Sequence, residues 1–564
     1  MKKILEIENL EFTYSGNRNT TLHDINLCLE EGQCLGITGE SGSGKTTLGL
    51  QLLGLANGEA RGTINYRGKN LLTLQEKELQ ELRWAKISMC FQNSLDALNP
   101  VYTIKEQITE PIVSHKLMTP EEAESRAEEL LYRFGVKRVD DYPHQLSEGQ
   151  RQLVLLAMSL ACDPELVVID EPTSNLDPLT RLRILETLDE VREDKTVLVI
   201  SHDIDTIMRL TDQIAILYGG TILERGDAKR VITDARHPYT FALLNSYPTM
   251  TTTKNLQDIR GSYDPTAEHR GCVYCDRCTQ AKPICGVVEP ELTSISASHE
   301  VRCHLGGLKV LLAGNNLTKT FTSRSGKVEA LKDVSIRVRE GEVLGVVGET
   351  GSGKTTLAKI LSGILEQDSG EVLFQDHFLS DLMRKERLST CSRLQYIPQD
   401  ASSAVNPRLT VLDAVKEPLV IHKSLNVDEA ALEAVSEAGL PTAEEFTGRR
   451  VTELSGGELK RLCLARVLTV NPKMIIADEP TSNLDASLQA RYVLRLLEIQ
   501  KSRGLGLMII THNIALARKI CDRIMVLRDG VNVEEGRSSA VISNPRHSYT
   551  RELVEAAPRL IGFS

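Results

Sequence analysis

The strongest constraint on this chain is that it repeats itself. The stretch Gly39-Glu-Ser-Gly-Ser-Gly-Lys-Thr-Thr47 recurs 309 positions later as Gly348-Glu-Thr-Gly-Ser-Gly-Lys-Thr-Thr356. The stretch Ile169-Asp-Glu-Pro-Thr-Ser-Asn-Leu-Asp177 recurs 308 positions later as Ala477-Asp-Glu-Pro-Thr-Ser-Asn-Leu-Asp485. Two motifs that recur at nearly the same offset indicate duplication of a whole domain.

The length of 564 residues agrees with a duplicated domain, because single hydrophobic cores stop growing near about 250–300 residues. We expect a first domain over residues 1–247 and a second over residues 308–564, which begins with an edge strand at Val310–Ala313. Between them, residues 248–307 form a cysteine-rich linker or extension of the first domain, which contains the Thr-rich stretch Thr249–Thr253 and shows no clear helix or strand period.

Composition excludes several classes of function. The net charge of −11 argues against non-specific nucleic-acid binding, which needs basic surface. The sequence contains no run of about 18 apolar residues, so no transmembrane helix is predicted. The N-terminal stretch has no apolar signal core. We therefore expect a cytosolic protein whose membrane role, if any, needs separate spanning subunits.

Each repeat is predicted to be an α/β domain built on a parallel sheet. Cys34–Gly39 indicates a strand that runs into a Gly-rich loop, and Leu166–Ile169 and Val197–Ile200 are typical of buried parallel strands. Segments between them have helical spacing, with Leu182, Leu185, Leu188 and Val191 expected near one helix face. The predicted fold is a parallel sheet flanked by helices.

The Gly-rich stretches match the pattern G-x-x-x-x-G-K-[ST] of a phosphate-binding loop. Lys45 and Lys354 are expected to reach the β- and γ-phosphates, and the Thr46 and Thr355 hydroxyls to bind magnesium. The following helix adds its positive N-terminal end. The expected nucleotide-binding residues of the loops are Gly39, Ser41, Gly42, Gly44, Lys45, Thr46, Thr47, Gly348, Thr350, Gly351, Gly353, Lys354, Thr355 and Thr356.

A second pair of residues ends an apolar strand in each repeat. Asp170 and Asp478 are expected to hold magnesium, directly or through water. The adjacent Glu171 and Glu479 are placed to polarise the attacking water.

With these motifs, the whole chain resembles the ATP-binding subunits of ABC transporters. The deciding match is the family signature L-S-G-G-Q, which appears as Leu146-Ser-Glu-Gly-Gln150 and Leu454-Ser-Gly-Gly-Glu458. The resemblance implies that two modules close head to tail over two ATP molecules. Ser455 and Gly457 would then face the nucleotide on the first loop, and Ser147 and Gly149 the nucleotide on the second.

Other family elements occur in register. Gln92 and Gln399 match the glutamine loop, which the resemblance places near magnesium and water. His202 and His512 match the switch histidine that contacts the γ-phosphate, 32 and 34 positions after the two aspartates.

The resemblance also gives roles to two loops and two aromatic residues. Ser174–Asp177 and Ser482–Asp485 match the loop that communicates between sites, and Tyr14 and Phe321 occupy the position of the aromatic that stacks on adenine. The signatures depart from the family at Glu148 and Glu458. We expect Glu148 to point away from the phosphates and both sites to be competent.

Several features narrow the resemblance to the oligopeptide, dipeptide and nickel importer class. An Asn-Pro pair and a predicted helix ending in Glu-Pro follow each glutamine, at Asn99 to Pro111 and at Asn406 to Pro418. Each module ends in a related tail, His237-Pro-Tyr-Thr240 and His547-Ser-Tyr-Thr550.

The cysteine cluster also resembles a segment of that class. Its spacing is C-x2-C-x2-C-x6-C, with one further cysteine downstream. The resemblance implies a four-iron iron–sulfur cluster; the alternatives are zinc or reduced thiols without metal. The cysteines that fit the family pattern are Cys272, Cys278, Cys285 and Cys303, with Cys275 extra.

The resemblance implies an ATP- and Mg²⁺-dependent importer motor, peripheral on the cytoplasmic face of the cell membrane. Its partners would be two transmembrane permeases and an extracytoplasmic solute-binding protein, with no nucleic acid. The alternative is a soluble tandem ABC ATPase acting on ribosomes or nucleic acid, and an exporter motor is a weaker third reading. The cargo, whether peptide, nickel chelate or another small solute, is not encoded in these motifs.

Overall fold

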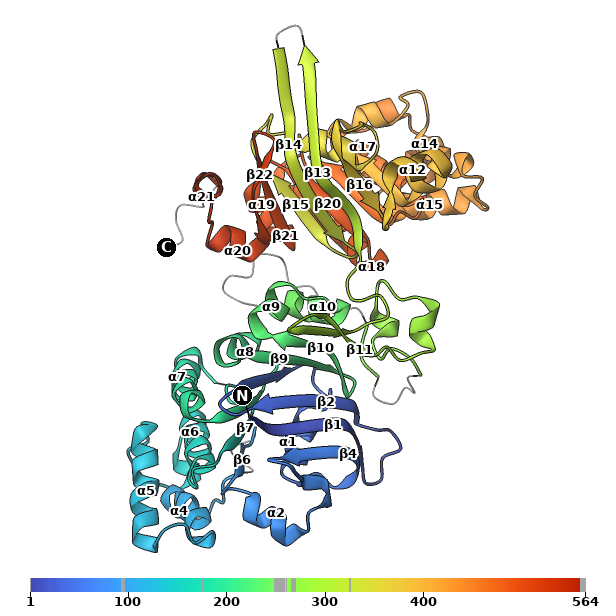
Figure 1. Cartoon of the computed structure of the whole chain (residues 1–564). Coiled ribbons are helices and arrows are strands. Elements are labelled where there is room, and N and C mark those ends of the chain that lie inside the picture. The colour runs from blue at the N-terminus through green and yellow to red at the C-terminus, as the bar shows by residue number, and fades with distance from the viewer. Residues whose placement is uncertain are drawn as a thin grey trace. The chain divides into compact units, whose positions relative to one another are not determined.

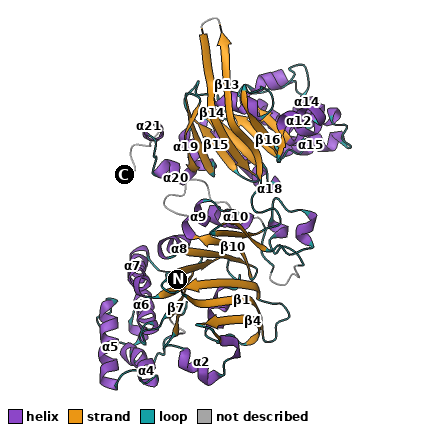
Figure 2. Cartoon of the chain, in the orientation of Figure 1, coloured by secondary structure: helices purple, strands orange, loops and turns teal. Residues whose placement is uncertain are grey.

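The computed structural model describes residues 2–92, 97–174, 176–247, 259, 261–264, 270–323 and 326–557. Asn175 of the repeated Asn-Leu-Asp stretch and Thr249–Thr253 lie outside the described residues. The chain forms two compact units, residues 1–244 with 261–307 and residues 308–564 with 245–260. Both units are α/β, with helices packed around their sheets (Figures 1 and 2). No described helix is long and apolar enough to cross a membrane.

The first unit contains two sheets. A small antiparallel sheet has the order β2-β1-β4-β5, and the main sheet has the order β11-β12-β10-β9-β3-β8-β7-β6. The strands are β1 (Lys3–Tyr14), β2 (Leu22–Glu30), β3 (Cys34–Thr38), β4 (Gly58–Tyr66), β5 (Lys69–Asn70), β6 (Ile87–Cys90), β7 (Leu166–Asp170), β8 (Thr196–Ile200), β9 (Gln213–Tyr218), β10 (Thr221–Asp227), β11 (Leu292–Ser296) and β12 (His299–Arg302).

The three predicted strands of this unit are confirmed. All residues of β3, β7 and β8 are buried. β8 pairs in parallel with both neighbours, with Val197 opposite Cys34 and Val167. Because the carboxyl ends of parallel strands meet at one edge, this sheet brings the Gly-rich loop after β3 close to the acidic pair at the end of β7.

Helices cover the main sheet of the first unit. They are α1 (Lys45–Leu52), α2 (Glu76–Leu82), α4 (Ile104–Ser114), α5 (Pro120–Arg133), α6 (Glu148–Ser159), α7 (Pro178–Asp194), α8 (Ile204–Leu210), α9 (Ala228–Thr233) and α10 (Pro238–Ser246), with short 3₁₀ turns η1 (Leu71–Thr73) and η2 (Pro143–Gln145).

Two details of the helix prediction were wrong. In α7 the buried face includes Ile184 and Val191, whereas Leu182 is exposed, because a three-residue spacing drifts around a helix of 3.6 residues per turn. Helix α4 does not end at Glu110-Pro111. It continues to Ser114, and the Pro111 carbonyl accepts a hydrogen bond from the His115 N–H.

The second unit repeats this plan, with sheets ordered β14-β13-β16-β17 and β18-β19-β20-β15-β21-β22. The stretch at Val310–Ala313, expected to be an edge strand, lies inside its sheet between β14 and β16. The strands are β13 (Val310–Ser323), β14 (Gly326–Arg339), β15 (Val343–Val347), β16 (Ser369–Phe374), β17 (His377–Phe378), β18 (Leu394–Ile397), β19 (Met474–Asp478), β20 (Gly506–Thr511), β21 (Arg523–Arg528) and β22 (Val531–Arg537).

The helices of the second unit follow the same order as those of the first. They are α11 (Lys354–Leu361), α12 (Leu379–Lys385), α13 (Arg387–Arg393), α14 (Val411–Ile421), α15 (Val427–Glu437), α16 (Glu444–Thr447), α17 (Gly456–Leu468), α18 (Ala486–Arg503), α19 (Ile514–Ile520), α20 (Ser538–Ser543) and α21 (Ser548–Glu555), with 3₁₀ turns η5 (Ala401–Ala404) and η6 (Val451–Glu453).

The cysteine-rich segment has structure that its sequence did not reveal. Two 3₁₀ turns, η3 (Cys275–Arg277) and η4 (Pro283–Gly286), precede a hairpin of β11 and β12. β12 pairs antiparallel with β10, with Val301 opposite Glu224, so the segment extends the main sheet of the first unit. In the second unit β22 is the last strand of its sheet. Residues 270–307 are called the extension below.

Candidate functional site

The first Gly-rich loop has backbone angles that favour glycine. Gly39, Gly42 and Gly44 have φ of 156°, 79° and 99°. A Cβ added at Gly39 would lie 1.9 Å from the Leu217 carbonyl oxygen, so no other residue fits there. Lys45, the first residue of α1, donates from Nζ to the Gly39 and Glu40 carbonyls at 2.9 Å each. Burial lowers the pKa of Lys45.

A cavity of about 510 Å³ opens beside this loop. Its walls bring together most of the predicted nucleotide-binding residues of the first repeat with the acidic and histidine residues from β7 and β8. The lining residues are Thr21, Gly39, Glu40, Ser41, Gly42, Gly44, Lys45, Thr46, Thr47, Gln92, Glu171, His202 and Leu243.

The second loop repeats the same backbone. Gly348 has φ of 156°, and an added Cβ would lie 2.1 Å from the Leu527 carbonyl oxygen. Lys354 Nζ donates to the Gly348 and Glu349 carbonyls at 2.8 and 2.6 Å. A cavity of about 610 Å³ beside this loop is lined by Phe321, Lys327, Val328, Glu329, Ala330, Lys332, Thr350, Gly351, Gly353, Lys354, Thr355, Thr356, Gln399, Glu479, His512 and Asp529.

Asp170 ends β7 with a buried carboxylate. Neither of its oxygens accepts a hydrogen bond of normal geometry from a described residue. Burial raises its pKa to about 6, while the neighbouring Thr46 hydroxyl and Lys45 ammonium act in the opposite direction. A buried carboxylate without partners is costly, and a divalent cation with oxygen ligands would satisfy it. Asp170 and Thr46 therefore fit a Mg²⁺ ion.

Asp478 has a different environment. Its Oδ2 accepts a hydrogen bond from the Tyr396 hydroxyl at 3.0 Å, while Oδ1 has no partner among the described residues. Burial raises its pKa, and the neighbouring Thr355 hydroxyl and the Tyr396 hydroxyl act in the opposite direction. Asp478 and Thr355 also fit Mg²⁺, with one carboxylate oxygen already engaged.

Glu171 is tied to the switch-histidine position. His202 Nδ1 lies 2.7 Å from Glu171 Oε1, and the His202 backbone N–H donates to the same oxygen at 3.0 Å. Ser174 and Ser201 donate to Oε2 at 3.2 and 3.3 Å. Burial raises the pKa of Glu171, but the bonds to His202 outweigh it and hold the pKa below its ordinary value. In turn, the hydrogen bond to Glu171 raises the pKa of His202.

The corresponding glutamate of the second unit is shared between two partners. His512 Nδ1 lies 3.2 Å from Glu479 Oε1, and Gln399 Nε2 donates to Oε2 at 2.9 Å. Glu171 and Glu479 both have positive φ, 49° and 45°, where the chain leaves the strand. The glutamate and histidine predicted for catalysis thus meet in each unit.

The two signatures form the exposed N-termini of α6 and α17. In the first, the Ser147 hydroxyl accepts a hydrogen bond from the Gln150 N–H at 3.3 Å, and Glu148 is exposed. In the second, Ser455 Oγ donates to Glu458 Oε2 at 2.7 Å. A Cβ added at Gly149 would lie 2.1 Å from Thr180 Cγ2, which explains the glycine by packing within the unit.

The two predicted adenine-stacking residues differ in position. Phe321 is 43% exposed and lines the second cavity. Tyr14 is half-buried and does not line the first cavity; its hydroxyl lies 3.1 Å from Thr47 Oγ1, and its ring packs edge-on against Phe12.

The two tails reach the phosphate loops, a contact that sequence reasoning missed. The Tyr239 hydroxyl accepts a hydrogen bond from the Glu40 N–H at 2.8 Å, and the Tyr549 hydroxyl accepts one from the Glu349 N–H at 3.0 Å. The repeated tail was the available signal. Burial also lowers the pKa of His237 to about 3, so this histidine is neutral at physiological pH.

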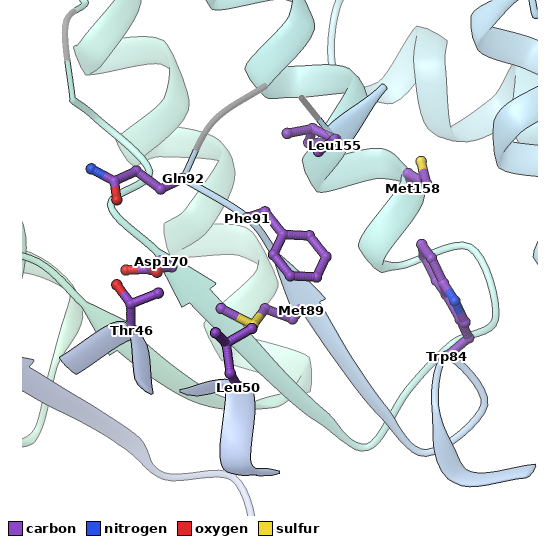
Figure 3. Close-up of a pocket in the computed structure, with 10 residues that line it drawn as sticks. Thr46, Leu50, Trp84, Met89, Phe91, Gln92, Leu155, Met158 and Asp170 are labelled. Carbon is purple, nitrogen blue, oxygen red and sulfur yellow. The ribbon is translucent and has the colours of Figure 1, made fainter. Parts of the chain in front are cut away.

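A second hollow lies beside Asp170 and is mostly apolar. Figure 3 shows Leu50, Met89 and Phe91 between the polar group of Thr46, Gln92 and Asp170 and the more distant Trp84. The hollow measures about 510 Å³. Its apolar wall accounts for the poor solvation of Asp170 and hence for its raised pKa.

One of the five cysteines of the extension, Cys285, is buried, and the other four are partly buried. Burial raises the pKa of the Cys272 and Cys278 thiols to about 12, and the Cys285 and Cys303 thiols add to both shifts. Among the described residues, no group of three or more His, Cys, Asp or Glu side chains could hold a metal ion. The predicted iron–sulfur cluster therefore has no support from the structure, and neither has zinc.

Comparison with known proteins agrees with this geometry. Residues 22–174 and 331–482, together more than half of the chain, match the ABC transporter family, and residues 223–285 and 533–562 match the oligopeptide/dipeptide transporter C-terminal region. The chain is 31% identical over 607 residues to the oligopeptide transport ATP-binding protein OppD of Mycobacterium tuberculosis, covering 99% of both chains.

Two further similarities are relevant. The chain is 32% identical over 583 residues to the glutathione import ATP-binding protein GsiA of Escherichia coli, covering 98% of this chain and 89% of that protein. A solved dimeric bacterial ABC transporter cassette is 30% identical, with a TM-score of 0.38, and covers 40% of this chain and 98% of that one. With its two phosphate loops, two acidic pairs and doubled family match, the chain belongs to the ABC transporter ATP-binding proteins and is an ATPase with two cassettes in tandem.

Proposed function

We propose that this chain is the ATP-hydrolysing motor of an importer for peptides or related small solutes. It would work at the cytoplasmic face of the membrane with two separate permeases and an extracytoplasmic solute-binding protein. The main support is the pair of tails, whose tyrosines bond to both phosphate loops and which match the oligopeptide/dipeptide transporter region. The similarity to an oligopeptide and a glutathione ATPase over nearly the full length adds to it.

The proposed roles follow the chemistry of each cavity. Lys45 and Lys354 leave their loop carbonyls to bind the phosphates of ATP. Bound Mg²⁺ would neutralise phosphate charge; its proposed ligands are Thr46, Gln92 and Asp170 in the first unit and Thr355, Gln399 and Asp478 in the second.

Glu171 and Glu479 are the proposed general bases. Each would orient the attacking water and take its proton, while His202 or His512 contacts the γ-phosphate. The contact of each glutamate with its histidine supports this role, because it would orient the base before water arrives. Ser147 and Gly149 of one signature, and Ser455 and Gly457 of the other, would complete the site on the opposite unit, as the family resemblance implies.

The importer role is tested by expressing the full chain with candidate peptide permeases and isolating membranes. We expect the chain to co-purify with one permease pair and its ATPase activity to rise when the loaded binding protein is added. Membrane association that needs no permease, or stable association with ribosomes, would contradict the importer role and favour the alternative.

A four-iron cluster on Cys272, Cys278, Cys285 and Cys303 remains a proposal that rests on their spacing and on the family resemblance. The test is iron and acid-labile sulfide analysis of anaerobically purified full-length chain. A colourless protein free of iron would overturn it, and a zinc content near one per chain would replace it with the zinc alternative.

A further inference from the structure

The extension places one charged side chain against the first phosphate loop. Arg277, at the end of η3, is 7% exposed and forms a bidentate ion pair with Glu40. Nη1 donates to Oε2 at 2.8 Å and Nη2 donates to Oε1 at 3.1 Å. Nη1 also donates to the Tyr218 hydroxyl at 3.0 Å. A planar guanidinium held in this way fixes both the charge and the orientation of its carboxylate partner.

Two aromatic rings lie close to the Arg277 guanidinium. Its guanidinium carbon lies 5.5 Å from the Tyr218 ring centre and 5.8 Å from the Tyr274 ring centre, within the range of cation–π attraction. The extension itself is fastened to the sheet by buried polar contacts: His299 Nε2 lies 2.6 Å from Glu224 Oε1, and Arg302 Nη2 donates to Asp24 Oδ2 at 2.7 Å. The extension, docked on the sheet, therefore places Arg277 against the first phosphate loop.

The glutamate that Arg277 engages lines the nucleotide cavity. Glu40 lines the first cavity, and its carbonyl oxygen accepts a hydrogen bond from Lys45. The Glu40 side chain is 26% exposed, so water screens its charge only in part. An unpaired carboxylate there would repel the phosphates of ATP, and the Arg277 guanidinium cancels that charge.

The second unit lacks this device. Glu349 is at the equivalent position, is exposed, and makes no ion pair with any residue the structure describes. Arg528 stacks over the Tyr549 ring at 4.6 Å and pairs with Asp529 instead. Solvent can screen Glu349, whereas Glu40 needs a partner.

We propose that Arg277 is a positioning residue of the first ATP site, where it neutralises and orients Glu40 so that the loop accepts the triphosphate. The proposal rests on the binding of ATP at the Lys45 loop described above. Under this proposal the extension contributes a residue to the first ATP site and none to the second.

The test is ATP binding by the full chain in a Lys354→Ala background, which removes the second loop. Equilibrium dialysis with labelled ATP and no divalent cation prevents turnover. We expect Arg277→Ala to weaken binding about five- to tenfold, because it leaves Glu40 charged and unpaired. With Glu40→Gln as its own reference, adding Arg277→Ala should change the affinity for ATP by less than about twofold.

Suppression by Glu40→Gln separates a charge effect from damage to the extension, since a misfolded extension would not be repaired by a change in the loop. Arg277→Lys should recover only part of the affinity, because it restores the charge but not the bidentate bond to Glu40. Added salt should shrink the defect of Arg277→Ala. As the matched control, Glu349→Gln in a Lys45→Ala background should leave ATP binding at the second loop unchanged.

Arg277→Ala with parental affinity would overturn the proposal, and so would a defect that Glu40→Gln does not repair. If the Lys354→Ala parent binds no ATP, the assignment of the Lys45 loop fails, and this proposal fails with it. That outcome differs from one in which the parent binds ATP and Arg277→Ala leaves the affinity unchanged.

Discussion

The two phosphate loops are nearly identical in sequence, yet the side chains around them differ. In the first unit neither Asp170 oxygen accepts a hydrogen bond of normal geometry from a described residue, whereas in the second Tyr396 donates to Asp478. Glu40 forms an ion pair with Arg277, whereas the Glu349 carboxylate forms no ion pair with a described residue. We therefore expect the shared motifs to give both sites the same chemistry, and the neighbouring residues to change how readily each site binds ATP and metal.

The largest expected effect tests whether both sites hydrolyse ATP. In the double variant Glu171→Gln with Glu479→Gln we expect steady-state turnover to fall by about 10²–10⁴-fold, the range for loss of a general base. Each single variant should lose at least about half of the activity, since one base remains. The turnover is measured as phosphate release by the purified chain. Full loss in one single variant and none in the other would show that only one site is competent.

A smaller effect is expected in the pH dependence of magnesium use. The pKa of Asp170 is raised to about 6 by burial, so its carboxylate is charged above that pH and neutral below it. Only the charged form holds Mg²⁺ well. In a Lys354→Ala chain, the Mg²⁺ concentration for half-maximal ATP hydrolysis should rise about threefold from pH 6.5 to 5.5, in proportion to the loss of carboxylate.

Asp170→Asn is the control for this pH dependence. The variant should need more Mg²⁺ at both pH values, and its requirement should no longer change between them. If the wild-type requirement is the same at pH 6.5 and 5.5, Asp170 is not the group that titrates.

The smallest expected effect concerns the signatures. Ser455 donates its hydroxyl hydrogen to Glu458, an acid where the first signature has Gln150. Glu458→Gln should free the Ser455 hydroxyl and remove a charge near the phosphate that it is proposed to face, lowering the KM for ATP about twofold. The reciprocal Gln150→Glu should raise the KM by a similar factor. Changes of the same sign in both variants would contradict this explanation of the asymmetry.

Sequence patterns predicted much of the fold, because buried parallel strands and Gly-rich loops have local signatures. The strands β3, β7 and β8 were predicted from their buried apolar runs. The family resemblance singled out His202, and the structure shows that it meets Glu171. The docked extension did not, because β11 is largely exposed and has no alternating pattern.

Contacts between distant segments were also beyond sequence reasoning. Arg277 and Glu40 are 237 positions apart, and nothing local to either residue indicates the other. The bond from the Glu40 N–H to Tyr239 spans 199 positions. The Arg277 pairing depends on how β12 pairs with β10 and so places the extension, whereas the Tyr239 bond depends on the position of α10.

The account requires that one chain binds two ATP molecules. The direct measurement is the ATP stoichiometry of the full-length double variant Glu171→Gln with Glu479→Gln, by equilibrium dialysis with Mg²⁺ at saturating nucleotide. We predict two ATP per chain, falling to one when either Lys45 or Lys354 is changed to Ala. A stoichiometry of one in the double variant, or of two after loss of either lysine, would contradict it.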